Sequence, residues 1–353
     1  MTIMRYKRFV SLFVGIMVFF VALNYVVWKV WTEDLLTDKN YIAGDLTRMG
    51  YIFGYKMYRK NYCDLPFRHI EADNYAGQKI DVLTIGDSFS NGGGGGRNRF
   101  YQDYIASINR FTVLNIHPYK NIDSLTTVSA LCNNGIIDRL KPRFILIESS
   151  QKFCIDDFAK PIDFELTIPS ENREPFSRTT DVSALPSLAF INNGNFKFLL
   201  YNLLYPISDH AFFGKVCIRE LTTNMFSVKN GTRLLFLRNE VKRATRATPE
   251  LVFLLNRNLN ILADKLSDKG INLYFMPCVD KYTLYSDYLS QNTYPKSTFF
   301  EELRKLPKKY NLIDTKEILS EELKKGAQDI FYADDTHWSW KASAAIFRKQ
   351  LFR

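Results

Sequence analysis

Residues 79–88 read KIDVLTIGDS. The first seven form a short apolar, β-branched run, which is typical of a buried strand, and Gly86 ends it. The turn Gly86-Asp87-Ser88 follows at once and leads into a glycine-rich loop. In open α/β sheets the reacting groups lie beyond the carboxyl ends of the strands. The stretch therefore predicts a strand and, in Ser88, a candidate nucleophile at its end.

Helical and strand-like segments alternate on both sides of this stretch, which predicts an α/β fold with a parallel sheet flanked by helices. Pro249 suits the first turn of one long helix, and Gly270 ends that helix. The expected helices are 98–108, 124–140, 249–268, 315–325 and 340–351; the expected further strands are 111–116, 143–148, 271–276 and 310–313.

Residues 155–248 interrupt the alternation and contain, among others, Pro169, Pro175, Pro186 and Pro206. They contain a possible helix at 187–204 and a strand-like run at 232–237. We interpret the region as an insertion or lid.

Residues 9–27, FVSLFVGIMVFFVALNYVV, carry no charge. This length approaches the ~20 residues needed to cross a bilayer. Basic residues precede the run and acidic ones follow it, so the positive-inside rule keeps residues 1–8 in the cytoplasm. We therefore expect a transmembrane anchor at 9–29, an extracytoplasmic stem at 30–77 and a catalytic domain at 78–353. A cleaved signal peptide is the alternative, and it would leave the domain in the same compartment.

The net charge of +10 is spread along the 353 residues without a basic run, and no nucleic-acid-binding motif is present. Anionic partners such as lipid head groups or acidic glycans suit this charge better than nucleic acid. The five cysteines include no C-x-x-C pair, which argues against a zinc ribbon. Buried thiols and a single disulfide remain open as alternatives.

A serine hydroxyl needs a neighbouring base to act as a nucleophile. Of the four histidines, His337 alone has two adjacent carboxylates shortly before it, in the segment YADDTHW at 332–338. An acid beside the imidazole fixes its tautomer and stabilises the imidazolium. Asp334 and Asp335 are both candidates for that acid, and Trp338 could pack the ring in place. A simple turn at Ser88 and a solvated loop at His337 are the alternatives.

Five consecutive glycines, 92–96, follow Asn91 directly after the nucleophile segment. Gly92 and Gly93 are candidate oxyanion donors because glycine lets backbone N–H groups approach a developing charge closely. A flexible surface loop is the alternative. The lipase elbow G-x-S-x-G, H-E-x-x-H and the P-loop motif are absent from the sequence, so we expect neither a metal site nor a cofactor.

GDSF at 86–89 and DTHW at 335–338 resemble the SGNH (GDSL-like) hydrolase superfamily, and most closely its alginate O-acetyltransferase-like branch. The segment 270–285, GINLYFMPCVDKYTLY, also resembles this branch. The resemblance covers roughly residues 78–353, and it is weak through 155–248. It implies a flavodoxin-like fold, a Ser–His–Asp triad and O-acetylation of an exported polysaccharide.

The branch places its acid two residues before the histidine, which favours Asp335, whereas the wider superfamily uses the position of Asp334. Asp334 is then expected to face solvent or to cap the next helix. In the alginate enzymes the Asp-x-His motif precedes the serine, whereas here it follows. The superfamily's Gly-x-Asn-Asp block is replaced by Glu-Ser-Ser-Gln at 148–151, which leaves Ser149 as a candidate third oxyanion donor.

The resemblance implies a polysaccharide acceptor and a membrane-bound O-acyltransferase as the partner that supplies acetyl groups. The expected location is the bacterial inner membrane, with the catalytic domain in the periplasm. An acetyl esterase with the same triad is the first alternative. A non-catalytic glycan-assembly protein is the second.

Overall fold

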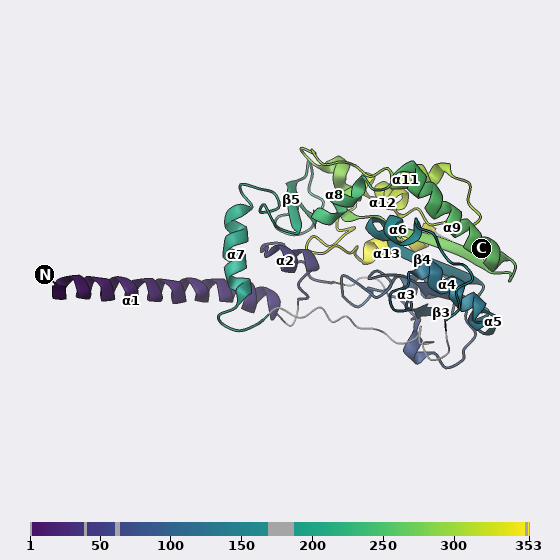
Figure 1. Ribbon diagram of the computed structural model, residues 1–353, viewed down its shortest axis with the longest axis horizontal. Coiled ribbons are helices and arrows are strands. Elements are labelled where there is room, and N and C mark those ends of the chain that lie inside the picture. The colour runs from purple at the N-terminus through teal and green to yellow at the C-terminus, as the bar shows by residue number, and fades with distance from the viewer. Residues whose placement is uncertain (1, 39–40, 61–63, 169–186, 350–351, 353) are drawn as a thin grey trace.

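The computed structural model describes residues 2–38, 41–60, 64–168, 187–349 and 352. Its centre is a sheet of six strands, all paired in parallel, with helices packed around it (Figure 1). This confirms the predicted α/β class and its parallel sheet. The strands are β1 (Ile70–Glu71), β2 (Val82–Ile85), β3 (Val113–Ile116), β4 (Phe144–Ser150), β7 (Asn272–Cys278) and β8 (Asn311–Leu312).

The strands lie in the order β1-β3-β2-β4-β7-β8. Apart from the short β1, which the sequence did not predict, the other five follow the doubly wound order 2-1-3-4-5. The direction of winding reverses between β2 and β4, and sheets of this type bind ligands at that reversal. All the residues of β2, β3 and β4 are buried, as expected for strands covered on both faces.

The helices that cover the sheet form two groups. Right-handed crossovers account for the division, because the chain moves in opposite directions along the sheet after β2 and after β3. One group contains α3 (Tyr101–Asn109), α12 (Thr315–Lys324) and α13 (Trp340–Lys349); the other contains α4 (Ser124–Asn133), α5 (Ile136–Leu140), α6 (Gln151–Phe158), α9 (Pro249–Ser267) and α11 (Phe299–Lys305).

The predicted insertion contains α7 (Asn193–Leu204), an antiparallel pair of strands and α8 (Arg238–Ala244). The two strands are β5 (Val216–Glu220) and β6 (Arg233–Leu237). Residues 169–186 of this region lie outside the described part of the chain.

Helix α1 (Thr2–Val27) continues through a π-helical segment (Trp28–Leu36) and projects away from the α/β body (Figure 1). The stretch Arg5–Leu36 is long and apolar enough to span a membrane. This stretch contains the uncharged run at 9–27 described above.

The predicted stem is not merely a connection. Its helix α2 (Asp45–Gly50) packs on the β5–β6 pair, and the two together enclose a small core. That core consists of Leu46, Ile52, Tyr55, Val216 and Leu235. The interpretation of residues 30–77 as a stem is therefore corrected: part of this segment belongs to the folded domain.

Four of the five cysteines, Cys132, Cys154, Cys217 and Cys278, are buried free thiols. Cys63 lies outside the described residues.

Candidate active site

Ser88 lies on an exposed turn directly after β2, on the side of the sheet where the winding reverses. Asp87 fixes this turn to β4: its carboxylate accepts hydrogen bonds from the Ser150 N–H at 2.8 Å and the Ser150 hydroxyl at 2.5 Å. It also accepts one from the Phe89 N–H at 3.1 Å. The turn therefore bridges the two strands at the reversal and holds Ser88 out toward solvent.

Glu148 supports the same turn from below. This fully buried side chain accepts hydrogen bonds from the Asp87 N–H at 3.0 Å, the Ser90 N–H at 3.1 Å and the Ser90 hydroxyl at 2.8 Å. Burial, reinforced by the charge of Asp87, raises the pKa of Glu148 well above its ordinary value. A buried carboxyl with three donors organises the turn without reaching solvent itself.

His337 is carried by a narrow hairpin between α12 and α13. Phe331 and Trp338 pair across it as an antiparallel bridge, and the Ser339 N–H donates to the Ile330 carbonyl at 2.8 Å. This pairing restrains the tip of the hairpin, residues 334–336. Asp335 and His337 therefore keep a fixed position relative to each other.

The predicted triad residues lie together in one hydrogen-bonded chain. His337 Nε2 is 2.8 Å from Ser88 Oγ, and His337 Nδ1 is 2.7 Å from Asp335 Oδ1. The His337 backbone N–H also donates to Asp335 Oδ1, at 3.0 Å. These distances suit a nucleophile, its base and the acid that orients the base.

The charges around the imidazole favour its protonated form. Burial lowers the pKa of His337, but the hydrogen bond and charge of Asp335 outweigh burial and raise the pKa above its ordinary value. Burial also opposes ionisation of Asp335, yet the hydrogen bond to His337 and the charges of His337 and Arg59 hold the pKa of Asp335 well below its usual range. An ionised Asp335 can therefore stabilise the imidazolium that forms when Ser88 loses its proton.

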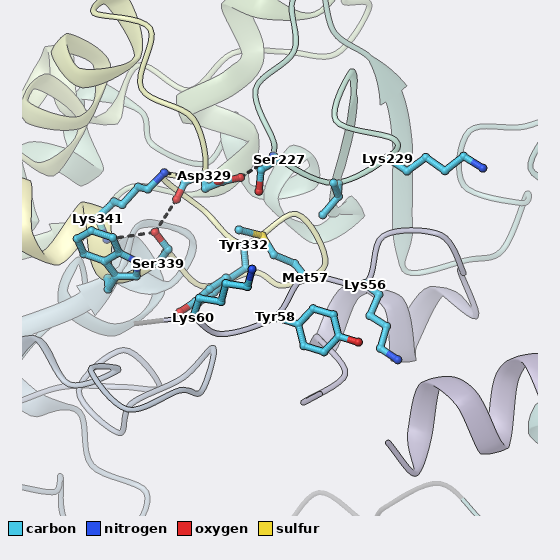
Figure 2. Close-up of a pocket in the computed structure, with 12 residues that line it drawn as sticks. Lys56, Met57, Tyr58, Lys60, Ser227, Lys229, Asp329, Tyr332, Ser339 and Lys341 are labelled. Atoms are coloured by element: carbon cyan, nitrogen blue, oxygen red, sulfur yellow. Dashed lines mark hydrogen bonds and ion pairs between the residues drawn. The ribbon is translucent and has the colours of Figure 1, made fainter. Parts of the chain in front are cut away.

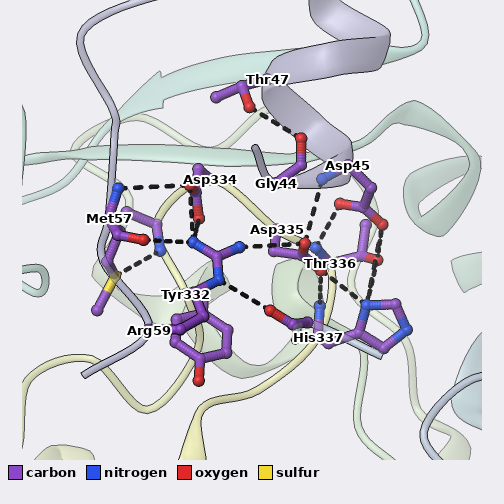
Figure 3. Close-up of polar contacts among 12 residues, drawn as sticks. Gly44, Asp45, Thr47, Met57, Arg59, Tyr332, Asp334, Asp335, Thr336 and His337 are labelled. Atoms are coloured by element: carbon purple, nitrogen blue, oxygen red, sulfur yellow. Dashed lines mark hydrogen bonds and ion pairs between the residues drawn. The ribbon is translucent and has the colours of Figure 1, made fainter. Parts of the chain in front are cut away.

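The Asp334 side chain does not touch the His337 imidazole, and it neither faces solvent nor caps the following helix, as the sequence suggested. Its buried carboxylate pairs with Arg59, whose Nη1 lies 2.8 and 2.9 Å from the two oxygens (Figure 3). The Tyr41 hydroxyl and the Met57 N–H also donate to it. Asp334 thus anchors the N-terminal segment, residues 41–60, to the hairpin that carries His337.

Arg59 also reaches the acid of the triad. Its Nη2 is 3.3 Å from Asp335 Oδ2, and its Nε donates to the Gly94 carbonyl at 2.8 Å. The guanidinium carbon lies 4.3 Å from the centre of the Tyr332 ring. One buried side chain therefore joins the N-terminal segment, the glycine loop and the hairpin.

Helix α2 contributes a second set of contacts. The Asp45 N–H donates to Asp335 Oδ2 at 3.1 Å, and the Asp45 carboxylate accepts from the Thr336 N–H at 2.7 Å and from the Thr336 hydroxyl. The Asp334 carbonyl in turn accepts N–H groups of the first turn of α2. A Cβ at Gly44 would collide with that carbonyl, which explains the glycine there.

Lys281, at the start of α10 (Lys281–Tyr285), holds the hairpin from the opposite side. This fully buried ammonium donates to the carbonyls of Tyr332 at 2.7 Å, Ala333 at 3.0 Å and Asp335 at 3.1 Å. Burial lowers the pKa of Lys281 to about 8, although the nearby aspartates act in the opposite direction. Three backbone acceptors thus match the three donors of one ammonium.

The ring that packs on the catalytic imidazole is Phe89, with 4.8 Å between ring centres. Trp338 packs on Phe89 at 4.6 Å, so its predicted role in holding His337 is indirect. Gly93 lies so close to the imidazole that a Cβ there would collide with His337. The glycine is needed for this approach.

The glycine loop does not offer the predicted oxyanion donors. The Gly92 N–H donates to the Phe89 carbonyl at 3.3 Å, and the Gly93 N–H donates to the Ser88 carbonyl at 2.8 Å. Ser149 is buried in β4, and its hydroxyl faces the Ser150 carbonyl at 3.4 Å.

Within residues 87–93 each backbone N–H has a protein acceptor except that of Ser88. The Ser88 amide is therefore the group in this turn that remains able to bind an oxyanion.

Two groups of side chains have the spacing of metal ligands in the described part of the chain. Asp45, Asp335 and His337 form one, and their ligand atoms are already engaged in the contacts above. The other consists of Asp209, His210 and Cys217. In it, Asp209 is paired with Arg219 at 2.6 Å, and burial raises the pKa of Cys217 to about 12. A nearby guanidinium and a protonated thiol do not suit a metal cation.

A pocket of about 410 Å³ lies beside the hairpin. It combines lysines with aromatic rings, and Tyr332 belongs both to its wall and to the catalytic hairpin (Figure 2). The wall includes Lys56, Tyr58, Lys60, Lys229, Asp329, Tyr332, Trp340 and Lys341.

Comparison with known proteins adds no assignment to this geometry. No family model and no curated protein matches the chain.

Proposed function

We propose that this protein is a membrane-anchored, extracytoplasmic serine O-acyltransferase of the SGNH type, which O-acetylates an exported polysaccharide. The observation that carries the proposal is the chain Ser88–His337–Asp335, with contacts of 2.8 and 2.7 Å. Further support comes from the order of five of the six strands, β3-β2-β4-β7-β8. Ser88 also lies beside the point in the sheet where the direction of winding reverses. The resemblance of 86–89 and 335–338 to SGNH motifs supplies the reaction class.

In the first half-reaction His337 Nε2 accepts the hydroxyl proton while Ser88 Oγ attacks the acetyl carbonyl of the donor. The Ser88 N–H stabilises the resulting oxyanion, and Asp335 stabilises the imidazolium. As the tetrahedral intermediate collapses, the bond to the donor breaks. His337 returns the proton to the leaving group, and an acetyl ester remains on Ser88.

In the second half-reaction a sugar hydroxyl gives its proton to His337 and attacks the acetyl ester. Collapse releases the acetylated sugar and regenerates the Ser88 hydroxyl. Water in place of the sugar would make the protein an acetyl esterase, which is the first alternative. The second alternative, a non-catalytic assembly protein, does not account for an exposed serine held against a buried Asp–His pair.

The basic pocket favours an acidic acceptor. Four lysines and three aromatic side chains line it, against the single carboxylate of Asp329. Asp329 is itself engaged by the Ser227 N–H at 2.8 Å and by Lys341 at 3.5 Å. Rings of this kind pack on sugars, and lysines attract carboxylated or phosphorylated glycans.

In the proposed orientation Ser88 lies outside the cytoplasm. Acetyl groups must then cross the membrane, and we propose that a membrane-bound O-acyltransferase delivers them. The uncharged run at 9–27, with basic residues before it, supports this orientation.

The experiment measures how much of the acetyl group is transferred to a sugar and how much is released to water as acetate. The purified full-length protein is given p-nitrophenyl acetate with an acidic or a neutral oligosaccharide, and acetylated sugar and free acetate are quantified. We expect acetylated acidic oligosaccharide with the wild type and none with Ser88→Ala. Release of all the acetyl as acetate at saturating acceptor would assign an esterase. Equal turnover by Ser88→Ala would reject both enzymatic functions.

A further inference from the structure

Helix α7 carries an uncovered apolar stripe. Phe196, Leu200 and Leu203 are 45%, 46% and 72% exposed, and Ile207, just beyond the helix, is 73% exposed. Their spacing of four, three and four residues places them on one side of a helix. The opposite side is buried through Asn195 and Phe198.

The stripe is part of a larger surface, which we call the α7 apolar face. Between Ser187 and Ser208 the only charged side chain is Lys197. Soluble surfaces rarely expose so many large apolar groups together. The face consists of Leu188, Phe190, Ile191, Phe196, Leu200, Leu203, Ile207, Phe212 and Phe213, each at least 40% exposed.

This face is fixed to the end of the apolar helix by buried polar contacts. Asn24 of α1 donates to the Phe190 carbonyl at 2.8 Å and accepts from Asn195 at 3.0 Å. The Thr32 hydroxyl donates to the Asn195 side chain at 3.0 Å. An asparagine in an otherwise apolar helix is thereby satisfied, and α7 holds a fixed position relative to α1.

A ring contact between α1 and α7 indicates how deeply α7 would lie in a membrane that α1 spans. Phe196 stacks on Phe20 with 5.9 Å between ring centres. Phe20 precedes Val27 by seven residues, which is about 10 Å along a helix. Amphipathic helices at a membrane surface bury their apolar side ~5–10 Å into the head-group boundary. Phe196 therefore lies where the outer end of a spanning α1 would still be in lipid.

The orientation agrees with that depth. Figure 1 shows α7 running across the axis of α1, between its projecting part and the catalytic body. A groove of about 500 Å³ separates α1 from the loop before α7, and its apolar walls suit an acyl chain. It is lined by Met17, Val18, Val21, Ala22, Tyr25 and Phe190.

We propose that the α7 apolar face is embedded in the outer leaflet of the membrane, so that α7 lies in the plane of the lipid surface. This rests on the proposed membrane anchoring by α1. Two elements then hold the catalytic body, and the body keeps one orientation toward the lipid instead of swinging on a single anchor.

Depth-dependent quenching tests the proposal on the full-length chain. A Cys63→Ser background leaves the four buried thiols, and Leu203→Cys adds one accessible site for an environment-sensitive fluorophore. The protein is reconstituted in phosphatidylcholine–phosphatidylglycerol vesicles with or without nitroxide-labelled lipid. Val14→Cys in α1 reports anchoring. Phe253→Cys is the matched control, because Phe253 is 57% exposed on α9, away from α7.

We expect lipid nitroxide to quench the labels at 203 and 14 several-fold and to leave the label at 253 unchanged. Quenching at 14 with none at 203 would overturn the embedded face while leaving the anchor intact. Absence of quenching at 14 would overturn the anchoring itself and the embedded face with it.

Discussion

Replacement of Arg59 by Met removes the buried cation that joins residues 41–60 to the hairpin that carries His337. The Arg59 and Asp334 side chains are 4% and 0% exposed, so the carboxylate left behind would be uncompensated. Breaking such a buried pair costs about 3–5 kcal/mol. Urea unfolding of the full-length protein in detergent, followed by tryptophan fluorescence, measures this loss of unfolding free energy.

The control is Arg233→Met, because the Arg233–Glu220 pair is about half exposed at 50% and 53%. An exposed pair contributes about 0–1 kcal/mol. The double variant Arg59→Met/Asp334→Asn removes both buried charges, and it should be more stable than Arg59→Met alone. Equal losses for Arg59→Met and Arg233→Met would refute the reasoning, and so would a double variant whose loss is the sum of the single losses.

Three further predictions follow from buried or titrating groups. Lys281→Met should lower the unfolding free energy by about 3 kcal/mol or more, because three buried carbonyls lose their donor; a loss below about 1 kcal/mol in urea unfolding would contradict this. Hydrogen bonds to Asp103 and Glu71 outweigh burial and raise the pKa of His69 to about 9, so its stabilisation of about 3 kcal/mol is present below pH 6.5 and is lost as the pH rises through 9. The stability difference between wild type and His69→Gln should therefore shrink between pH 6 and pH 10, and a constant difference would disprove the linkage. Because the pKa of His337 is raised and the base must be neutral, kcat/KM for an ester should rise with pH through a midpoint above 6.5; a midpoint at or below 6.5 would count against it.

Local sequence signals predicted the main sheet well. The runs around Val82–Ile85, Phe144–Ser150 and Asn272–Cys278 are apolar strands bounded by polar or glycine residues, and the structure places all three in the sheet. Such strands are recognisable because burial on both faces requires continuous apolar sequence. The two-residue β1 carries no such pattern, and it was missed.

The residues of the proposed triad could be chosen from sequence because each stands beside an interpretable neighbour. Ser88 lies on the turn after a strand, and Asp335 lies two residues before His337. The choice between Asp334 and Asp335 is resolved by contact: Asp335 approaches the imidazole at 2.7 Å, whereas Asp334 binds Arg59.

The supporting residues could not be predicted, because their partners are distant in the chain. Arg59 and Asp45 meet the hairpin across 275 or more positions, and no local period marks them. Glu148 follows an apolar run and Lys281 follows Asp280, and in neither case does the local sequence reveal which groups the buried charge will meet. A buried charge flanked by strand residues is nevertheless a usable signal, because it must be paired.

Acyl-enzyme formation at Ser88 tests the central claim most directly. The full-length protein is mixed with p-nitrophenyl acetate, quenched in acid within the first turnover and digested, and the peptides are analysed by mass spectrometry. We predict one added acetyl group on the peptide that contains Ser88. The acetyl group should be absent from Ser88→Ala, retained in the exposed-serine control Ser290→Ala, and formed ~10³–10⁶-fold more slowly in His337→Ala. Acetylation of another residue, or an unchanged rate in Ser88→Ala, would contradict the assignment of Ser88 as the nucleophile.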